Sequence, residues 1–313
     1  MQTVLHRLYK PRGWLLRELE RRHDVVVASQ VPMARVTTFR IGGPAATMLI
    51  PRTLAGLEKC LERLEATGRR YFVLGRGSNL LVSDSGVETV LSLREFSAVE
   101  SQPYPSDANS VIVTAGAGCG LRQLVAWCAR RGLGGIEGLA GIPASVGGAL
   151  FMNAGASGVS FGDLVQEVLL TSSQGSSWVG RDGLRFGYRK TGLPEECIIS
   201  AVRLRLYVVS PSATKKNIVS VIRRRAASQP IGLASAGCVF KNFDDEPAGL
   251  VIDRCGLKGL RQGGAIVSPV HANFIVNTGG ASSRDVLGLI ERVRRRVFEE
   301  TGRMLCQEVR VWH

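Results

Sequence analysis

The chain has 313 residues, 45% of them hydrophobic and 21% charged, so it can bury a core of normal size and is expected to form two domains rather than one. The 40 Lys and Arg residues exceed the 26 Asp and Glu residues, and the formal net charge of +14 indicates an anionic ligand or partner. Seven Cys without a C-x-x-C pair, and four His without an H-E-x-x-H motif, argue against a disulfide framework and a metal site.

The N-terminal residues 1–27 mix charged and apolar side chains, and they contain no apolar run of the length that a signal peptide needs. No stretch approaches the roughly 18 apolar residues that would predict a membrane helix. We therefore expect a cytoplasmic protein that does not insert into a membrane. The basic runs Arg223–Arg225 and Arg294–Arg296 lie in helical patterns, and three roles stay open for them: a solvated helix face, a nucleic-acid surface, or help in binding phosphorylated small molecules.

The first part of the chain is predicted to alternate between strands and helices. Residues 100–109 are rich in turn formers and predict a boundary between subdomains. The predicted elements before it are one or two surface helices within residues 1–30, a turn between short strands at 37–44, a helix from Thr53 to Gly68, and strands at 71–74 and 89–93.

Further along, the helix predicted from about Thr214 turns Ile218, Val219 and Ile222 inward and its arginines outward. Ser282 and Asp285 have the spacing of a capping box and begin another helix, which Gly302 ends. The fold class is α+β. The other predicted elements are strands at 111–115, 167–171, 198–207, 264–267, 273–277 and 306–312, and a helix at 121–132.

Two glycine-rich segments are candidate anion sites. Gly75–Val82 leaves a strand through two glycines and then offers Ser78 and Asn79, while Gly138–Gly162 contains no charged residue at all. Backbone amides of such segments can approach a phosphate closely, because small side chains leave the surface open. Each segment by itself could equally be a tightly packed turn. As a pair, they could bind one pyrophosphate between two subdomains.

Three further groups could carry chemistry. Arg189 beside Tyr188 offers a fork for a carboxylate or phosphate, or is a surface residue at the end of a strand. Cys238 lies in a short turn with Lys241, where a cation would favour the thiolate, although most free cysteines are small buried apolar groups. Glu308 is the single acid of the last predicted strand and could also be an exposed position of its alternation.

Seven segments follow one another in a fixed order, and they are spread over the chain from residue 37 to its end. The chain thereby resembles the UDP-N-acetylenolpyruvoylglucosamine reductase family, and its short third region is similar to the family's shorter subtype. The segments are TTFRIGGPA (37–45), LGRGSNLLVSDSG (74–86), GLAGIPASVGGALFMNAGA (138–156), FGYRKTGL (186–193), SAGCVFKNF (235–243), AGLVIDRCGLKGLRQGGAIVSPVHANFIVN (248–277) and ETGRMLCQEVRVW (300–312).

The resemblance implies a two-lobed FAD-binding fold of the vanillyl-alcohol-oxidase type, followed by a smaller α+β substrate domain. The implied ranges are 1–95 for the first lobe with an N-terminal extension (1–30), 96–209 for the second lobe and 210–313 for the substrate domain. It further implies an NADPH-dependent reduction of UDP-N-acetylglucosamine enolpyruvate to UDP-N-acetylmuramate through non-covalent FAD. We expect no bound metal, no nucleic-acid partner, and a monomer or weak oligomer.

The resemblance also implies roles for individual residues. Arg189 and Glu308 would be catalytic partners that stabilise charge on the substrate carboxylate, and Cys238 falls where most members have a proton-donating Ser. Substrate contacts would come from Tyr188, Lys241, Asn242, Lys258, His271 and Asn273. Cofactor contacts would come from Gly75, Arg76, Gly77, Ser78, Asn79, Leu80, Gly138, Gly141, Ile142, Pro143, Ala144, Ser145, Gly147, Gly148 and Asn153.

The chain departs from the family pattern at two places. Ala144 stands where many members have Gly, so the backbone there must accept a Cβ and is expected to keep a negative φ. Val36 precedes the Thr pair where a polar residue is more usual. Two rival functions stay open: a flavin oxidase or dehydrogenase of the same fold with another substrate, and a basic binding protein without chemistry.

Overall fold

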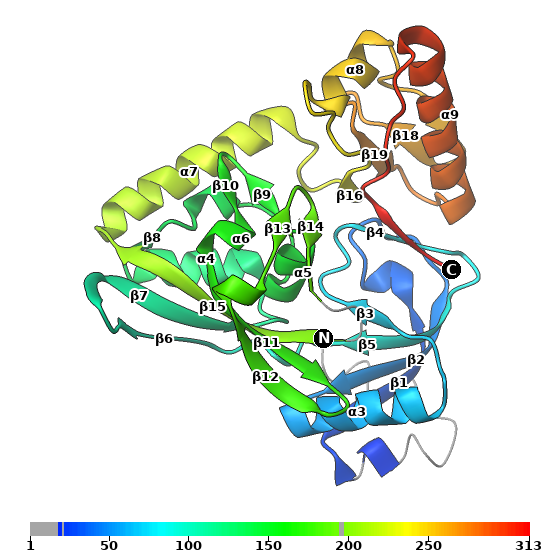
Figure 1. Cartoon of the computed structure of the whole chain (residues 1–313). Helices are drawn as coiled ribbons and strands as arrows, with labels where there is room; N and C mark the ends of the chain where they lie inside the picture. The colour runs from blue at the N-terminus through cyan, green and yellow to red at the C-terminus, as the bar shows by residue number, and fades with distance from the viewer. Residues whose placement is uncertain (1–17, 21, 194–196) are drawn as a thin grey trace. The chain divides into compact units, whose positions relative to one another are not determined.

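The computed structural model of the chain describes residues 18–20, 22–193 and 197–313 (Figure 1). These residues form two compact units, and each unit is assembled from three separate stretches of chain. The helices expected near the N-terminus fall largely in residues 1–17, outside the described residues. Unit 1 runs up to Ser29 and then comprises Thr47–Arg76 and Thr89–Arg224, and unit 2 comprises Gln30–Ala46, Gly77–Glu88 and Arg225–His313.

The units differ from the three consecutive ranges 1–95, 96–209 and 210–313 that we expected. At three of the positions where the chain leaves one unit and enters the other, it does so within a strand. These strands are β1 (Val25–Pro32), β2 (Pro44–Pro51) and β5 (Val87–Ser92). These strands form a sheet in the order β1-β2-β5-β3, with β3 at Phe72–Leu74. Because the chain passes back and forth along sheet strands, no single cut in the sequence separates the units.

Strand β1 was not predicted from the sequence. Its sequence, VVVASQVP, does not alternate between apolar and polar residues, and the three consecutive residues 27–29 are all buried. A strand that is covered on both faces reads as a short apolar run, which periodicity alone cannot distinguish from a buried piece of helix.

The main sheet of unit 1 is antiparallel. Its order is β12-β11-β15-β7-β6, and β8 (Leu133–Gly134) pairs with the end of β15. The turn-rich residues 100–109, expected as a boundary, instead form the β6–β7 hairpin, in which Tyr104 pairs with Asp107. The strands are β6 (Val99–Tyr104), β7 (Asp107–Gly116), β11 (Val165–Ser172), β12 (Gly175–Gly180) and β15 (Ile198–Val208).

The first long helix of unit 1 begins where its capping residue predicts. Helix α3 (Leu54–Ala66) starts after Thr53, whose hydroxyl accepts a hydrogen bond from the Gly56 amide at 3.1 Å, and Gly68 follows it with a φ of +61°. Its apolar face lies against β11 and β12. The other helices are α4 (Leu121–Arg130), α5 (Val146–Phe151) and α6 (Phe161–Leu164).

Helix α7 (Pro211–Ser228) confirms one of the three predicted inward positions, since Ile218 packs against the core of unit 1, but not the other two. Val219 and Ile222 are 46% and 47% exposed, whereas Thr214 and Val221 are buried. Arg225, expected on the outer face, is half buried. Apolar residues at 218, 219, 221 and 222 allow more than one inward stripe, and only the packing surface selects one of them.

Unit 2 has its own core around an antiparallel sheet in the order β16-β19-β18-β17. Helix α9 (Ser283–Thr301) packs on this sheet; Ser282 and Asp285 form the predicted capping box, and Gly302 ends the helix with a φ of +69°. The C-terminal strand β20 (Arg310–Trp312) pairs in parallel with β4 (Leu80–Val82). The other elements are α8 (Ala248–Arg254), β16 (Ser235–Cys238), β17 (Arg261–Gln262), β18 (Ala265–Val267) and β19 (Phe274–Asn277).

Candidate active site

The first glycine segment leaves β3 and reverses sharply. A Cβ on Gly75 would collide with the Ser145 hydroxyl, so the absence of a side chain lets the segment lie against the start of α5 within unit 1. Gly77 has a φ of +60°. Among the described residues, the amides of Arg76, Gly77 and Ser78 donate to no protein acceptor, and successive free amides around a left-handed residue are typical of an anion site.

The second glycine segment presents its groups differently. The Gly147 amide donates to the Ala117 carbonyl at 2.8 Å, and the Gly148 amide donates to the Ser145 hydroxyl at 3.2 Å. These amides are therefore already used within the protein. What Gly148 offers is an open surface, because a Cβ there would meet only Ser145 Oγ, at 3.1 Å. The first amides of α5 are therefore not available to an anion, and the segment offers an open surface at Gly148 instead.

Ala144 takes the backbone conformation that we expected. It is not among the described residues with positive φ, and it packs against the core of unit 1 while its carbonyl accepts the Leu121 amide at 2.8 Å. Gly141, three residues earlier, has a φ of +82° and carries the sharp bend instead. The Ala in place of Gly at position 144 therefore causes no backbone strain. Of the other expected cofactor residues, Ile142 packs on the core, Gly138 and Leu80 are buried and Pro143 is exposed.

Arg189 lies in a strained turn. Strands β13 (Phe186–Gly187) and β14 (Lys190–Thr191) form a hairpin whose two turn residues are Tyr188 and Arg189. Tyr188 is 53% exposed, and the Arg189 guanidinium lies 5.1 Å from the centroid of its ring. Arg189 has a φ of +56°, which costs a residue with a Cβ about 1–2 kcal/mol. A bulky residue at a position suited to Gly motivates the hypothesis that its side chain serves a function.

Asn153 joins this hairpin to the glycine-rich segment. Its side-chain amide donates to the Gly187 carbonyl at 2.9 Å, and its Oδ1 accepts the Gly162 amide at 2.9 Å. The residue is 8% exposed and has a φ of +38°. Its side chain thus positions the backbone beside Tyr188 and Arg189, and the cofactor contact that we expected of Asn153 stays a prediction.

Asn79 has a comparable role in unit 2. Its side-chain amide donates to the Glu308 carbonyl at 3.3 Å, and its own carbonyl accepts the Arg310 amide at 3.1 Å. The first glycine segment is therefore hydrogen-bonded to the backbone of the candidate catalytic acid. No local pattern in the sequence signals this connection, because the residues are more than 200 positions apart.

Cys238 ends β16 at an irregularity in its pairing with β19, and it is half buried. The backbone beyond it is held by Asn273, which is 2% exposed. The Asn273 side chain both accepts the Phe240 amide, at 2.9 Å, and donates to the Phe240 carbonyl, at 2.8 Å. Asn273 had been a candidate for substrate contact, but these bonds occupy its amide in positioning the Cys238 segment.

Arg225 is a further candidate site residue, which the sequence prediction did not name. Burial lowers the pKa of its guanidinium, and the charge of Cys238 acts in the opposite direction, which places the two groups within electrostatic reach in unit 2. A neighbouring cation favours the thiolate form of a cysteine. Lys241 was the cation that we had expected in this role; the only available signal for Arg225 was its membership of the basic run at 223–225.

The remaining substrate candidates differ in how free their side chains are. Asn242 Oδ1 accepts the Ala248 amide at the start of α8, at 3.1 Å, and Lys258 forms an ion pair with Asp253 at 2.6 Å. His271 Nδ1 accepts the Asn273 amide at 3.2 Å. Burial and the charge of Lys258 lower the pKa of His271. Lys241, by contrast, is half buried and uses its backbone amide on the Cys306 carbonyl, at 2.8 Å.

Comparisons with known proteins agree with this architecture. The model of an FAD binding domain matches residues 45–179, and that of the UDP-N-acetylenolpyruvoylglucosamine reductase C-terminal domain matches residues 229–312. The reductase of that name from Syntrophobacter fumaroxidans is 41% identical over 92% of this chain and 84% of its own, and that from Geobacter metallireducens is 42% identical over 90% and 92%. The solved Thermus caldophilus reductase is 40% identical, with a TM-score of 0.76 over 92% of this chain and 99% of its own.

These findings define a flavin-dependent oxidoreductase with an N-terminal FAD-binding domain and a smaller C-terminal domain, and they confirm the predicted α+β class. The chain belongs to the UDP-N-acetylenolpyruvoylglucosamine reductase family. No helix in the described ranges is long and apolar enough to cross a bilayer. In the same ranges, no three His, Cys, Asp or Glu residues are grouped so as to bind a metal ion.

The strain at Arg189 predicts opposite effects of two substitutions. Arg189→Gly removes the penalty of the positive φ and should unfold with a free energy about 1 kcal/mol higher than Arg189→Ala, measured by urea titration. At Lys190, whose φ is not positive, the Gly variant should be the less stable of the pair. Equal stabilities of the two Arg189 variants would contradict a strained turn.

The lowered pKa of His271 predicts a loss of stability in acid. A base whose pKa is lower in the folded state than in the unfolded state, where it is about 6.5, stabilises the fold above that pH. The free energy of unfolding therefore falls as the pH drops through about 6.5, where His271 of the unfolded chain takes up a proton. In the folded state, protonation of Nδ1 would remove the acceptor for the Asn273 amide. His271→Asn should flatten the pH dependence of the unfolding free energy between pH 7 and 5, and His313→Asn should leave it unchanged. An unaltered slope in His271→Asn would refute this assignment.

Proposed function

We propose that this protein reduces the enolpyruvyl group of UDP-N-acetylglucosamine enolpyruvate, with NADPH as reductant, to give UDP-N-acetylmuramate for peptidoglycan synthesis. The observation that carries the proposal is the 41% identity over 92% of the chain to a reductase named for this substrate. The side chains Arg189, Cys238 and Glu308 match the chemistry, since they provide a cation, an acid and a carboxylate.

The residues present fit FAD. Three amides of the segment Arg76–Ser78 donate to no acceptor in the described chain, and Gly148 leaves an open surface in the matched FAD-binding domain. Bound FAD would accept a hydride from NADPH and supply it to the methylene carbon of the substrate. The chain itself binds the phosphates through backbone amides and adds positive charge from Arg76, which suits a cofactor with two phosphates.

Arg189 would stabilise the charge that develops when the substrate takes up hydride. Negative charge then grows on the neighbouring carbon and its carboxylate, and a guanidinium can bind a carboxylate through two parallel hydrogen bonds. The turn that holds Arg189 is fixed through Asn153, so the guanidinium is oriented before the substrate binds. Tyr188, beside it and exposed, would contact the substrate.

Cys238 would deliver the proton that completes the reduction. One C=C bond is consumed, a hydride adds to the methylene carbon, and the thiol proton adds to the carbon that bears the carboxylate. A thiol has a pKa of about 8.5 in unfolded peptides and is a far stronger acid than a hydroxyl, so Cys can replace Ser in this role. Arg225 would stabilise the resulting thiolate until water returns the proton. Glu308 would act on the same substrate from the segment bonded to Asn79.

The proposal extends to the setting of the enzyme. A cytoplasmic location agrees with the NADPH and the nucleotide substrate that the reaction needs, and with a described chain that has no helix able to span a bilayer. We propose a monomer or a weak oligomer. The net charge of +14 suits FAD, NADPH and a nucleotide sugar, which are all anionic, and makes a nucleic-acid partner unnecessary.

Two half-reactions test the function. The purified protein should be yellow, and under anaerobic conditions NADPH should bleach its flavin. Addition of UDP-N-acetylglucosamine enolpyruvate should then restore the oxidised spectrum. A colourless protein would favour the basic binding protein without chemistry. A flavin that NADPH reduces but this substrate does not re-oxidise would favour a flavin enzyme with a different substrate.

Cys238 provides a sharper prediction within this assay. Cys238→Ser should retain turnover, whereas Cys238→Ala should keep flavin reduction by NADPH and lose re-oxidation by the substrate about 10²–10⁴-fold, the usual contribution of a positioned acid. Cys197→Ala, at a cysteine that is half buried like Cys238, is the matched control and should behave as the unaltered protein. Full re-oxidation by the Cys238→Ala variant would exclude Cys238 as the proton donor.

A further inference from the structure

Two segments of unit 2 that carry the proposed reacting groups run antiparallel to each other. The Glu308 amide donates to the Val239 carbonyl at 2.7 Å, and the Lys241 amide donates to the Cys306 carbonyl at 2.8 Å. Phe240 and Gln307 pair between them as an isolated antiparallel bridge. We call these two segments, residues 238–242 and 305–309, the catalytic ladder. Its register decides where Glu308 lies relative to the segment of Cys238.

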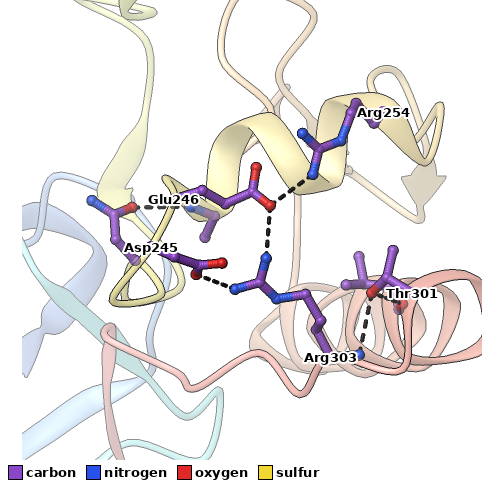
Figure 2. A network of polar contacts seen from close by, with 8 residues as sticks. Asp245, Glu246, Arg254, Thr301 and Arg303 are labelled. Carbon is purple, nitrogen blue, oxygen red and sulfur yellow. Dashed lines mark hydrogen bonds and ion pairs between the residues drawn. The ribbon is translucent and has the colours of Figure 1, made fainter.

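Arg303 lies just before the second segment of this ladder. It binds the loop that follows the first segment, residues 243–246. Its guanidinium forms an ion pair with Glu246 at 2.7 Å and another with Asp245 (Figure 2). Its Cζ lies 3.9 Å from the centroid of the Phe243 ring. The hydrogen bond from Arg303 lowers the pKa of Asp245. One planar side chain thus contacts three of the four residues of the loop.

The loop is also tied to both neighbouring helices. Glu246 accepts a second charged hydrogen bond, from Arg254 of α8, at 2.8 Å, and the Arg303 amide donates to the Thr301 hydroxyl of α9, at 3.2 Å (Figure 2). The Phe243 amide donates to the Glu246 carbonyl at 3.1 Å and closes the loop on itself. We call Arg303 and the loop 243–246 that it binds the clamp. The clamp is hydrogen-bonded to α8 through Glu246 and to α9 through the Arg303 amide.

This network is better suited to fixing geometry than to adding stability. Isolated ion pairs at a surface contribute about 0–1 kcal/mol, because solvent screens them. Arg303, however, is only 28% exposed and Glu246 21% exposed, and the guanidinium fork and the aromatic ring fix its orientation. Lys at this position would keep the charge but lose the fork.

The clamp reaches the proposed substrate residues through a short stretch of chain. Asn242 directly precedes Phe243, and its side chain accepts the Ala248 amide just beyond the loop. A loop released from Arg303 would loosen both ends of the 242–248 turn and the adjacent rung at Lys241 and Cys306. Arg303 itself begins the run that leads to Glu308.

We propose that Arg303 is a positioning residue that sets the register of the catalytic ladder and thereby the placement of Lys241, Asn242 and Glu308. The activity part of this inference rests on the function proposed above, and the structural part does not. A misplacement of about 1 Å in a catalytic constellation can cost about 10²-fold in rate. The clamp thus acts on the reaction without touching the substrate.

Arg303→Met tests the proposal, because it keeps the length of the stem and removes the fork. Hydrogen exchange of the full chain, followed by mass spectrometry, should be about 10-fold faster in peptides that contain the Lys241 and Glu308 amides, and unchanged in peptides from α9. Arg295→Met is the matched control, since Arg295 is 69% exposed on α9 with a 3.9 Å contact to Glu299. Unchanged exchange at the ladder in Arg303→Met would overturn the proposal whatever the substrate is.

The half-reactions give the second readout. In Arg303→Met, re-oxidation of the flavin by UDP-N-acetylglucosamine enolpyruvate should be at least about 10-fold slower, while reduction by NADPH should stay within about 2-fold of the unaltered protein. In Arg303→Lys, the rate of re-oxidation should lie between those of Arg303→Met and the unaltered protein. An equal loss in both half-reactions would indicate a merely structural role and overturn the proposal, whereas failure of the unaltered protein to be re-oxidised would refute the proposed function instead.

If Arg303→Met does not fold, the acceptor side of the clamp can be changed. The double variant Asp245→Asn, Glu246→Gln keeps Arg303 and removes both carboxylates that hold it. It should show the same faster exchange at the Lys241 and Glu308 amides. A ladder that exchanges as in the unaltered protein would overturn the proposal in this variant as well.

Discussion

Buried backbone must find hydrogen-bond partners, and this constraint organises the candidate site. The segments that carry Arg189, Cys238 and Glu308 are irregular, so regular sheet pairing cannot satisfy all their amides and carbonyls. Three asparagines supply the missing partners: Asn153 beside Arg189, Asn273 beside Cys238 and Asn79 beside Glu308. An amide side chain suits this task because one end donates and the other accepts. At each candidate group, an asparagine side chain from another segment therefore holds the backbone at or near that residue.

The positive charge of the chain is distributed in a way that weakens the case for a nucleic-acid surface. Several arginines on the sheet of unit 1 are already neutralised or stacked: Arg203 pairs with Glu167 at 2.6 Å and lies over Trp178, and Arg205 pairs with Asp107 at 2.9 Å and lies over Tyr104. Arg225, in contrast, is half buried near Cys238. Only a small part of the net charge of +14, such as the charge of Arg225, therefore lies near a candidate reacting group.

Strain and order occur together at the site. Arg189 and Asn153 both have positive φ, a conformation in which Gly would cost less, and both have side chains that act on the hairpin or are presented by it. Ala144, where family members often have Gly, shows the reverse case, since its φ is not positive and the bend is taken by Gly141. Strained positions such as Arg189 and Asn153 motivate the hypothesis of a functional role, because strain of this kind is common at active sites.

The sequence by itself determined the features that depend on neighbours along the chain. The capping box at Ser282 and Asp285, the left-handed ends at Gly68 and Gly302, the two glycine segments and the α+β class all follow from local patterns, and the ordered motifs identified the family. Only the tertiary structure decided the features that depend on distant pairing. Strand β1, the inward face of α7 and the clamp at Arg303 each depend on contacts with other elements of the fold. A local sequence pattern shows which conformation a residue prefers. Where several conformations or buried faces are possible, the contacts made in the folded chain decide which one forms.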